Sequence, residues 1–381
     1  MRFPMPFFGK EEAREEVCRL ALSEGSNRRQ LCRRFGIGAK TLYRWLNRYR
    51  QEGSAGLVER SRCPHRTPRR TDAAMDAAVL AVRRENPVWG GRKIAASLRR
   101  QGLSPPVAST ITEILRRHGR LQPPVRQRHA WQRFERAAPN HLWQMDFKGH
   151  LPLGQGAGRL HPLIVLDDHS RFAIGLQACP DERGSTVRTH LTELFRCYGL
   201  PDRMLMDNGP PWGTSQFAQH VYTPLSMWLL RLGIGISHGR PHHPQTQGKD
   251  ERFHRTLKGE VIERRGWQDL ADCARAFEAW RHVYNAERPH EALDLATPAS
   301  RYRPSYRSFP ETLAPIDYGP GAIVRKVQAK GEISFARHEW PVGKAFTGQP
   351  VALHPTSVDG RYDVIFCHQK VAELDLREAK P

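Results

Sequence analysis

The chain of 381 residues lacks several features that would settle its class quickly. Its seven cysteines are scattered and include no C-x-x-C pair, so we expect neither a disulfide framework nor a structural zinc site. No apolar run approaches the roughly 20 residues of a membrane-spanning helix, and the first residues show no signal-peptide pattern. The pattern G-x-x-x-x-G-K-[ST] is also missing, which argues against a P-loop nucleotide site. These absences predict a cytoplasmic protein with no membrane partner.

Negative charge is scarce in one part of the chain. The sequence has 60 Lys and Arg against 39 Asp and Glu, a formal net charge of +21. Residues 1–140 contain 30 of the basic residues but only 12 of the acidic ones, so most of the excess is N-terminal. Concentrated positive charge strengthens binding to a polyanion through counterion release. The first partner to consider is therefore a nucleic acid, and the alternative is a merely soluble basic surface.

Hydrophobic spacing predicts three helices within residues 1–54: residues 11–24, Arg28–Phe35 and a helix that begins near Ala39. The short Gly36-Ile37-Gly38 connection gives the last two the spacing of a helix-turn-helix DNA-binding domain. The alternative is a plain three-helix bundle with a solvated basic face. The wet face of the third helix is basic and polar, and its expected DNA contacts are Lys40, Arg44, Asn47 and Arg48.

A second helical unit repeats this pattern over residues 71–119, where helices are expected at 72–85, 91–100 and 107–118. We interpret it as a second helix-turn-helix-like DNA-binding domain, with Arg92 and Lys93 as expected contacts. Basic, Pro-containing segments at residues 55–70 and 120–139 are predicted linkers.

Near residue 140 the pattern changes to alternating strands and helices, which predicts an α/β core over residues 140–303. A Gly/Pro/His/Gln-rich stretch from His238 to Gly248 precedes a helix that begins near Lys249. Short β-prone pieces predict a small β-rich domain over residues 318–381. The fold class is thus multidomain: all-α helix-turn-helix units, an α/β core and a β-rich C-terminal domain. The core should contain a mixed five-stranded sheet built from His141–Lys148, Leu160–Leu166, Arg171–Leu176, Arg203–Met206 and Ile234–Ile236.

Three acids occupy suggestive places in that core. Asp146 lies in the first strand, Asp207 ends the fourth, and Glu251 begins the helix after the loop. The order of strands and helices brings the ends of the first and fourth strands together, beside that helix. Carboxylate oxygens suit Mg²⁺ or Mn²⁺, and two such ions can activate an attacking oxygen and stabilise a leaving one. Asp167 and Asp168 are also candidates, but paired acids in a tight turn more often cap the backbone.

The helix that carries Glu251 has two distinct faces. Phe253, Leu257 and Val261 fall on one side, whereas Arg255 and Lys258 fall on the side of Glu251. An acid flanked by cations suits a phosphodiester backbone, and the alternative is a surface Glu–Arg pair. The expected DNA contacts on this helix are Arg252, Arg255 and Lys258.

Several segments together resemble the insertion-sequence DNA transposases that have an integrase-type catalytic core. They are WQMDFK (143–148), LDDHSR (166–171), MDNGPPW (206–212), HPQTQGKDERFHRTLK (243–258), YN (284–285) and RPH (288–290). The resemblance implies an RNase H-like fold and an Asp-Asp-Glu triad, which maps onto Asp146, Asp207 and Glu251. The 43 residues between the last two acids exceed the spacing in many relatives. We expect an extra segment around Thr214–Leu232 to absorb the difference.

The resemblance implies a transposase that binds the terminal inverted repeats of its element and catalyses metal-dependent strand cleavage and strand transfer. Its triad would hold two Mg²⁺ ions, or Mn²⁺. Its partners would be element-end and target duplex DNA, with a homo-oligomer assembled on the DNA and a nucleoid-associated location. Two alternatives remain at this point: a DNA-binding regulator with an inactive core, and a general RNase H-type nuclease.

Overall fold

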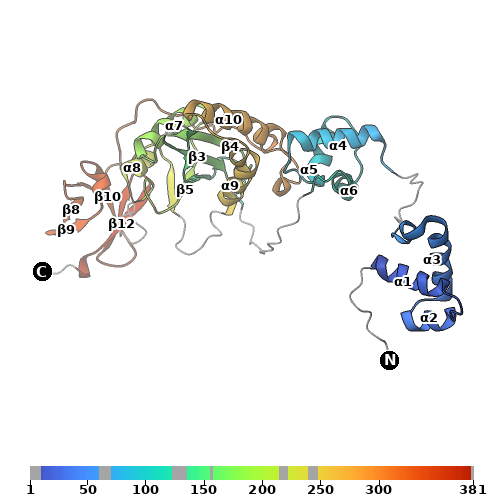
Figure 1. Ribbon diagram of the computed structural model, residues 1–381. Coiled ribbons are helices and arrows are strands. Elements are labelled where there is room, and N and C mark those ends of the chain that lie inside the picture. The colour runs from blue at the N-terminus through green and yellow to red at the C-terminus, as the bar shows by residue number, and fades with distance from the viewer. Residues whose placement is uncertain are drawn as a thin grey trace. The chain divides into compact units, whose positions relative to one another are not determined.

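The computed structural model describes residues 10–59, 70–121, 135–154, 158–213, 222–238 and 248–378 (Figure 1). The chain forms two compact units, Met1–Arg70 and Thr71–Pro381. Most of both predicted linkers, residues 239–247 of the predicted loop and residues 214–221 of the predicted extra segment lie outside the described residues. Within the described residues, no helix is long and apolar enough to cross a bilayer.

The first unit is a small helical domain with the predicted helix-turn-helix order. Asn27 caps the second helix by accepting a hydrogen bond from the Gln30 amide, and Gly36 ends that helix in the left-handed region at φ 65°. Leu42 and Leu46 are buried against the first helix. The elements are α1 (Lys10–Leu22), α2 (Arg28–Phe35), α3 (Ala39–Glu52) and the 3-10 turn η1 (Gly53–Leu57).

The second unit begins with another three-helix domain. Ile94 and Leu98 pack with Ile111 and Leu115 in its core. Gly91 allows the close approach of two helices, because a Cβ there would lie 2.3 Å from the Ala108 carbonyl oxygen. The helices are α4 (Ala73–Glu85), α5 (Gly91–Arg100) and α6 (Ala108–Arg117).

A mixed sheet forms the centre of the second unit. The five predicted strands are present, and the two-residue strand β2 extends the sheet beside β3. The path β2-β3-β1-β5-β6 runs through the sheet, β4 pairs with the other edge of β3, and β1 is parallel to β5 but antiparallel to β3. The strands are β1 (Trp143–Phe147), β2 (Leu151–Pro152), β3 (Arg159–Asp167), β4 (Ala173–Cys179), β5 (Arg203–Met206) and β6 (Gly235–His238).

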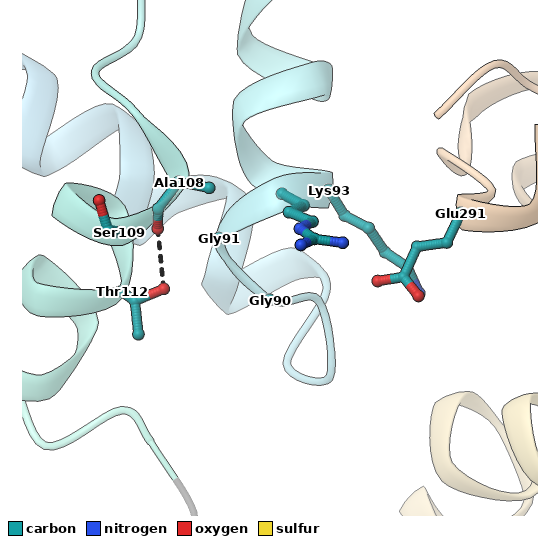
Figure 2. A pocket seen from close by; sticks show the side chains of 8 residues that line it. Gly90, Gly91, Lys93, Ala108, Ser109, Thr112 and Glu291 are labelled. Atoms are coloured by element: carbon teal, nitrogen blue, oxygen red, sulfur yellow. Dashed lines mark hydrogen bonds between the residues drawn. The ribbon is translucent and has the colours of Figure 1, made fainter. Parts of the chain in front are cut away.

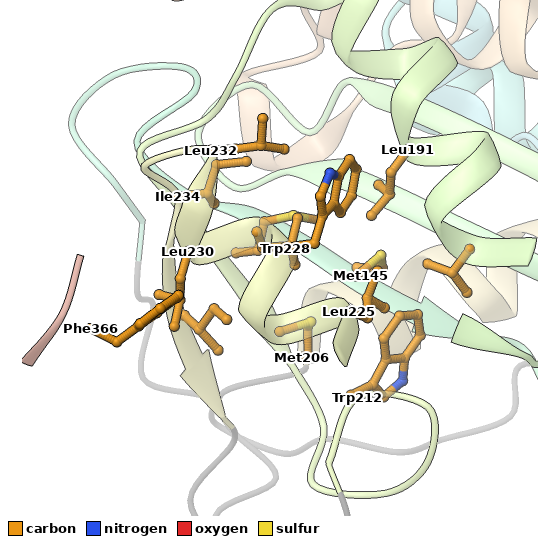
Figure 3. Close-up of a cluster of buried hydrophobic side chains, with 14 of the residues drawn as sticks. Met145, Leu191, Met206, Trp212, Leu225, Trp228, Leu230, Leu232, Ile234 and Phe366 are labelled. Carbon is orange, nitrogen blue, oxygen red and sulfur yellow. The ribbon is translucent and has the colours of Figure 1, made fainter. Parts of the chain in front are cut away.

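Helices cover both faces of this sheet. Alternating side chains of β1 and β3, such as Met145 and Val165, pack under α7 (Gly184–Tyr198) and α8 (Pro224–Arg231) (Figure 3). Residues of opposite parity, such as Ile164, pack under α9 (Gly248–Glu260) and α10 (Leu270–His282). The period-2 pattern of the strands therefore supplies both cores. Short helical turns follow at η4 (Ile262–Arg264), η5 (Val283–Glu287), η6 (Glu291–Leu293) and η7 (Pro298–Ser300).

The C-terminal region is β-rich, as predicted, but contains two strands that the sequence analysis missed, β9 and β12. Both are half-exposed and alternate with charged residues, so they lack the continuous apolar run of a buried strand. The domain packs on the core: the Ile236 amide donates to Gln369 Oε1 at 2.8 Å. Its elements are β7 (Ile323–Lys326), β8 (Glu332–Phe335), β9 (His338–Pro341), η8 (Lys344–Phe346), β10 (Pro350–Pro355), β11 (Arg361–Phe366), β12 (Gln369–Asp375) and η9 (Leu376–Glu378).

Candidate active site

The first two predicted acids lie on neighbouring parallel strands. Trp143 pairs with Met204 and Gln144 with Leu205. The same offset, continued along both strands, brings Asp146 opposite Asp207. Adjacent strands lie about 4.8 Å apart, so the two carboxylates share the carboxyl edge of the sheet. This edge is where open parallel sheets commonly place their sites.

The electrostatics of Asp146 reflect this placement. Burial raises the pKa of Asp146 to about 7, and the nearby Asp207 carboxylate raises it further in the same direction. The backbone amide of Phe147 and the charge of Lys148 act weakly against these effects. Two acids that resist simultaneous ionisation are a suitable place for a cation, since a cation favours both charged forms.

Asp207 is held in place by its own turn. Its Oδ1 accepts a hydrogen bond from the Gly209 amide, and its carbonyl oxygen accepts one from His238 Nδ1 at 2.9 Å. The turn ends at Trp212, whose ring stacks on Phe147, with centroids 5.5 Å apart and an interplanar angle of 24°. The turn after Asp207 is therefore packed against the residue after Asp146.

Helix α9 is fixed at its start by a buried ion pair. Lys249 Nζ donates to Asp168 Oδ1, and the Asp168 side chain is fully buried. Gln144 Nε2 donates to the same oxygen at 2.6 Å, and the Arg136 amide donates to Asp168 Oδ2 at 2.8 Å. Asp168 therefore ties β1, the β3–β4 turn and the first turn of α9 together.

The far end of α9 is fixed in the same way. Arg288 Nε donates to Glu260 Oε1 at 3.0 Å, with both side chains over 90% buried. Trp280 Nε1 donates to the other Glu260 oxygen at 3.0 Å. With both ends anchored, the orientation of α9 over the sheet is set by buried polar contacts as well as by Phe253 and Leu257.

The first turn of α9 carries two consecutive acids with opposite environments. Glu251 is exposed, whereas Asp250 is 2% exposed and its Oδ1 has no hydrogen-bond partner. Burial raises the pKa of Asp250 well above its usual range, and the charges of Asp146 and Asp168 act in the same direction. One turn later, His254 Nε2 lies 3.8 Å from Asp146 Oδ2. Burial lowers the pKa of His254 to about 4, with a further contribution from Lys148.

The three predicted acids are only partly brought together. Asp146 and Asp207 are close, and α9 contacts β1 at Asp146 through His254, one turn from Glu251. Among the residues that the structure describes, no group of three or more His, Cys, Asp or Glu side chains is already arranged to hold a metal ion. The donor set at this edge nevertheless fits a hard divalent cation, because it combines carboxylates with a buried, unpartnered imidazole nitrogen.

The predicted DNA contacts on α9 lie along its outer face. Arg252 pairs with Glu291 at 3.3 Å, Lys258 pairs with Glu263 at 3.3 Å, and Arg255 is exposed. Both ion pairs are more than 45% exposed, so solvent weakens them and a phosphate can compete for either cation.

On the N-terminal helices the predicted contacts differ in exposure. Lys40, Arg44 and Asn47 of α3 are exposed, and Arg48 is half-buried. On α5, Arg92 is exposed.

Lys93 is different, because it extends toward Glu291 of the core beside a pocket at the start of α5 (Figure 2). Burial lowers the pKa of Lys93 to about 8, and the charge of Arg288 adds to this effect.

The sequence analysis missed the part played by Asp168. The expectation that Asp167 and Asp168 cap the turn holds for Asp167, which accepts from the Ser170 amide and hydroxyl and from the Asn140 amide. Asp168 instead receives the ammonium group of Lys249, 81 residues away in the sequence. The signal available was a lysine two residues before Glu251, but no local pattern identifies its partner.

Comparison with known families gives a consistent assignment along the chain. Residues 322–381 match the C-terminal domain of IS481 family transposases. Residues 136–244 and 232–298 match two descriptions of the integrase core domain. Residues 13–65 match a helix-turn-helix domain and residues 41–115 a homeodomain-like domain. This chain has the domain set of an insertion-sequence transposase with an integrase-type core.

Individual relatives agree with this transposase assignment. An uncharacterized 31.7 kDa protein of insertion element IS407 from Burkholderia multivorans is 26% identical over 162 residues, covering 42% of this chain and 55% of the relative. A 39.2 kDa protein of insertion element IS476 from Xanthomonas euvesicatoria is 26% identical over 184 residues, covering 48% and 49%. The chain thus spans about half the length of these relatives. The catalytic core domain of BIV integrase aligns over 43% of this chain and 93% of its own, with 25% identity and a TM-score of 0.32.

Proposed function

We propose that this chain is a DNA transposase that binds the inverted repeats at the ends of its element, cleaves one strand there, and joins the freed 3′ end to target DNA. The observation that supports it most is the placement of Asp146 beside Asp207 at the carboxyl ends of β1 and β5, under the helix that carries Glu251. Burial with a neighbouring acid makes these groups poor isolated carboxylates but good ligands for a shared cation.

Each residue then has a defined task. Asp146 and Asp207 provide carboxylate oxygens from the rigid sheet, and Glu251 provides one from the start of α9. Bound there, two Mg²⁺ or Mn²⁺ ions would supply activation of the attacking oxygen and charge stabilisation of the leaving oxygen. Arg255 and Lys258 lie one and two turns after Glu251, where they are placed to contact phosphates near the scissile bond. The helix-turn-helix domains position the DNA end.

The alternative is a DNA-binding regulator that uses only the helix-turn-helix domains. It is supported by the absence of a preassembled metal cluster among the described residues. Against it stand the anchors of α9 at Asp168 and Arg288, which orient the predicted catalytic helix at the cost of burying charges. A core without chemistry gains nothing from that orientation.

The test uses linear DNA containing the coding sequence with its genomic flanks, incubated with the full chain and Mg²⁺. We expect strand breaks with 3′-hydroxyl ends at the flanking repeats, and joining of these ends to a second duplex. Asp207→Asn should abolish cleavage while its affinity for the same DNA stays unchanged. Asp202→Asn is the matched control, because Asp202 lies before β5, away from the carboxyl edge, and is exposed. DNA binding without cleavage by the wild type would favour the regulator, and cleavage without joining would favour a nuclease.

A further inference from the structure

His254 occupies a position that the triad does not account for. It lies on α9, one turn after Glu251, and its side chain is only 14% exposed. Its Nε2 is inaccessible to solvent and has no hydrogen-bond partner. A buried nitrogen left without a partner costs stability, which is usually recovered when a proton or a cation occupies the gap.

The gap in front of this nitrogen has the dimensions of a coordination site. His254 Nε2 and Asp146 Oδ2 are 3.8 Å apart, too far for a hydrogen bond. Two ligand atoms at about 2.1 Å from one ion are about 3.0 Å apart at right angles and about 4.2 Å apart when opposite. The observed separation lies between these limits, so one cation can contact both atoms without movement of the backbone.

A second pair in the same unit shows what is special here. His190 Nδ1 is also buried, unpartnered and 3.8 Å from a carboxylate, Glu193 Oε2. That carboxylate is 62% exposed and lies on the same turn of α7, so water satisfies it. Asp146 is instead 24% exposed and faces a second acid, Asp207. The need for a cation is therefore confined to the His254 pair.

We infer that His254 Nε2 is a nitrogen ligand of the divalent ion bound by Asp146, so that the site is a mixed nitrogen and oxygen site and not one of carboxylates alone. This inference rests on the proposed function. Imidazole binds Mn²⁺ and later transition metals better than Mg²⁺, which prefers oxygen. His254 thus biases the Asp146 position toward Mn²⁺.

The test is pulsed electron paramagnetic resonance of the full chain with substoichiometric Mn²⁺. The wild type should show modulation from a directly bound imidazole nitrogen, and labelling its histidines with nitrogen-15 should change the modulation frequency. His254→Gln should lose the modulation, and its preference for Mn²⁺ over Mg²⁺, measured by competition, should fall about tenfold or more. The matched control His190→Asn should retain both.

The outcomes separate the two proposals. Mn²⁺ binding that Asp146→Asn or Asp207→Asn abolishes, but without imidazole modulation in the wild type, overturns the role of His254 and leaves the proposed function intact. Modulation that persists in His254→Gln assigns the nitrogen to another histidine and also overturns it. If Mn²⁺ binding is unaffected by Asp146→Asn and Asp207→Asn, the metal site itself fails, and the proposed function fails with it. The labelled wild type gives an answer even if His254→Gln does not fold.

Discussion

Lys249 Nζ donates a hydrogen bond to Asp168 Oδ1, and this buried pair joins the β3–β4 turn to the first turn of α9. Asp168 also accepts hydrogen bonds from Gln144 of β1 and from the Arg136 amide. The carboxylate thus collects donors from three segments at the base of the candidate site. Since Glu251 lies two residues after Lys249, the pair sets where the third predicted acid is presented.

Breaking this pair on one side should destabilise the core strongly. Asp168→Asn leaves the Lys249 ammonium buried without its counter-charge, and we expect a loss of about 3–5 kcal/mol in the free energy of unfolding. Removing both charges in Asp168→Asn/Lys249→Met should cost less than the sum of the two single changes. Urea denaturation of the four proteins gives the coupling energy. Strict additivity would show that the two groups do not interact.

Trp212 should be the residue that keeps the Asp207 turn against β1. It is 2% exposed and stacked on Phe147. Trp212→Ala should lower the free energy of unfolding by about 3–5 kcal/mol, because it leaves a cavity between the two strands that carry acids. Trp212→Phe keeps an aromatic ring over Phe147 and should cost clearly less. Equal losses in the two variants would contradict a role for the stacked ring.

His290 should make the core less stable in acid. Burial lowers its pKa to about 3, with Arg288 as a further cause, and its Nε2 lies 3.3 Å from the Tyr284 hydroxyl. The unfolded chain takes up a proton at this group near pH 6.5 while the folded chain does not. The stabilisation is therefore complete above pH 6.5 and is lost as the pH falls toward 3.

At pH 5 this difference amounts to about 2 kcal/mol relative to pH 7.5. Urea denaturation at the two pH values should show a smaller change for His290→Gln than for the wild type. The comparison between the two proteins matters, because Asp146 and Asp250 have raised pKa values and act with the opposite sign. Identical pH dependence in both proteins would exclude His290 as the cause.

Arg44 on the exposed face of α3 should contact a DNA phosphate. Arg44→Ala should weaken binding to a short random-sequence duplex several-fold and reduce the slope of log affinity against log salt by about 0.9. Arg19→Ala is the control, since Arg19 of α1 is equally cationic and 73% exposed but pairs with Glu16. Titrations by fluorescence anisotropy at several salt concentrations measure both. Equal effects of the two substitutions would indicate general electrostatic attraction without a defined contact.

Much of the fold was predictable because it is written in local periodicity. The bounds of α2, α5 and β5 agree with the sequence prediction to the residue, since Gly and Asn signals or clean apolar spacing mark their ends. The half-exposed strands β9 and β12 were missed because their alternating charged residues resemble loop composition. The family assignment rests on motifs such as residues 243–258, which are also local.

The sequence by itself determined the order of the domains, the strands that carry Asp146 and Asp207, and the helix that carries Glu251, because each follows from spacing along a short segment. Only the tertiary structure decided that Lys249 meets Asp168, that Asp250 is buried while Glu251 is exposed, and that His254 faces Asp146. Those outcomes depend on which long-range surfaces exclude water, and desolvation decides which charged or polar groups need a partner. No pattern of neighbouring residues encodes that exclusion.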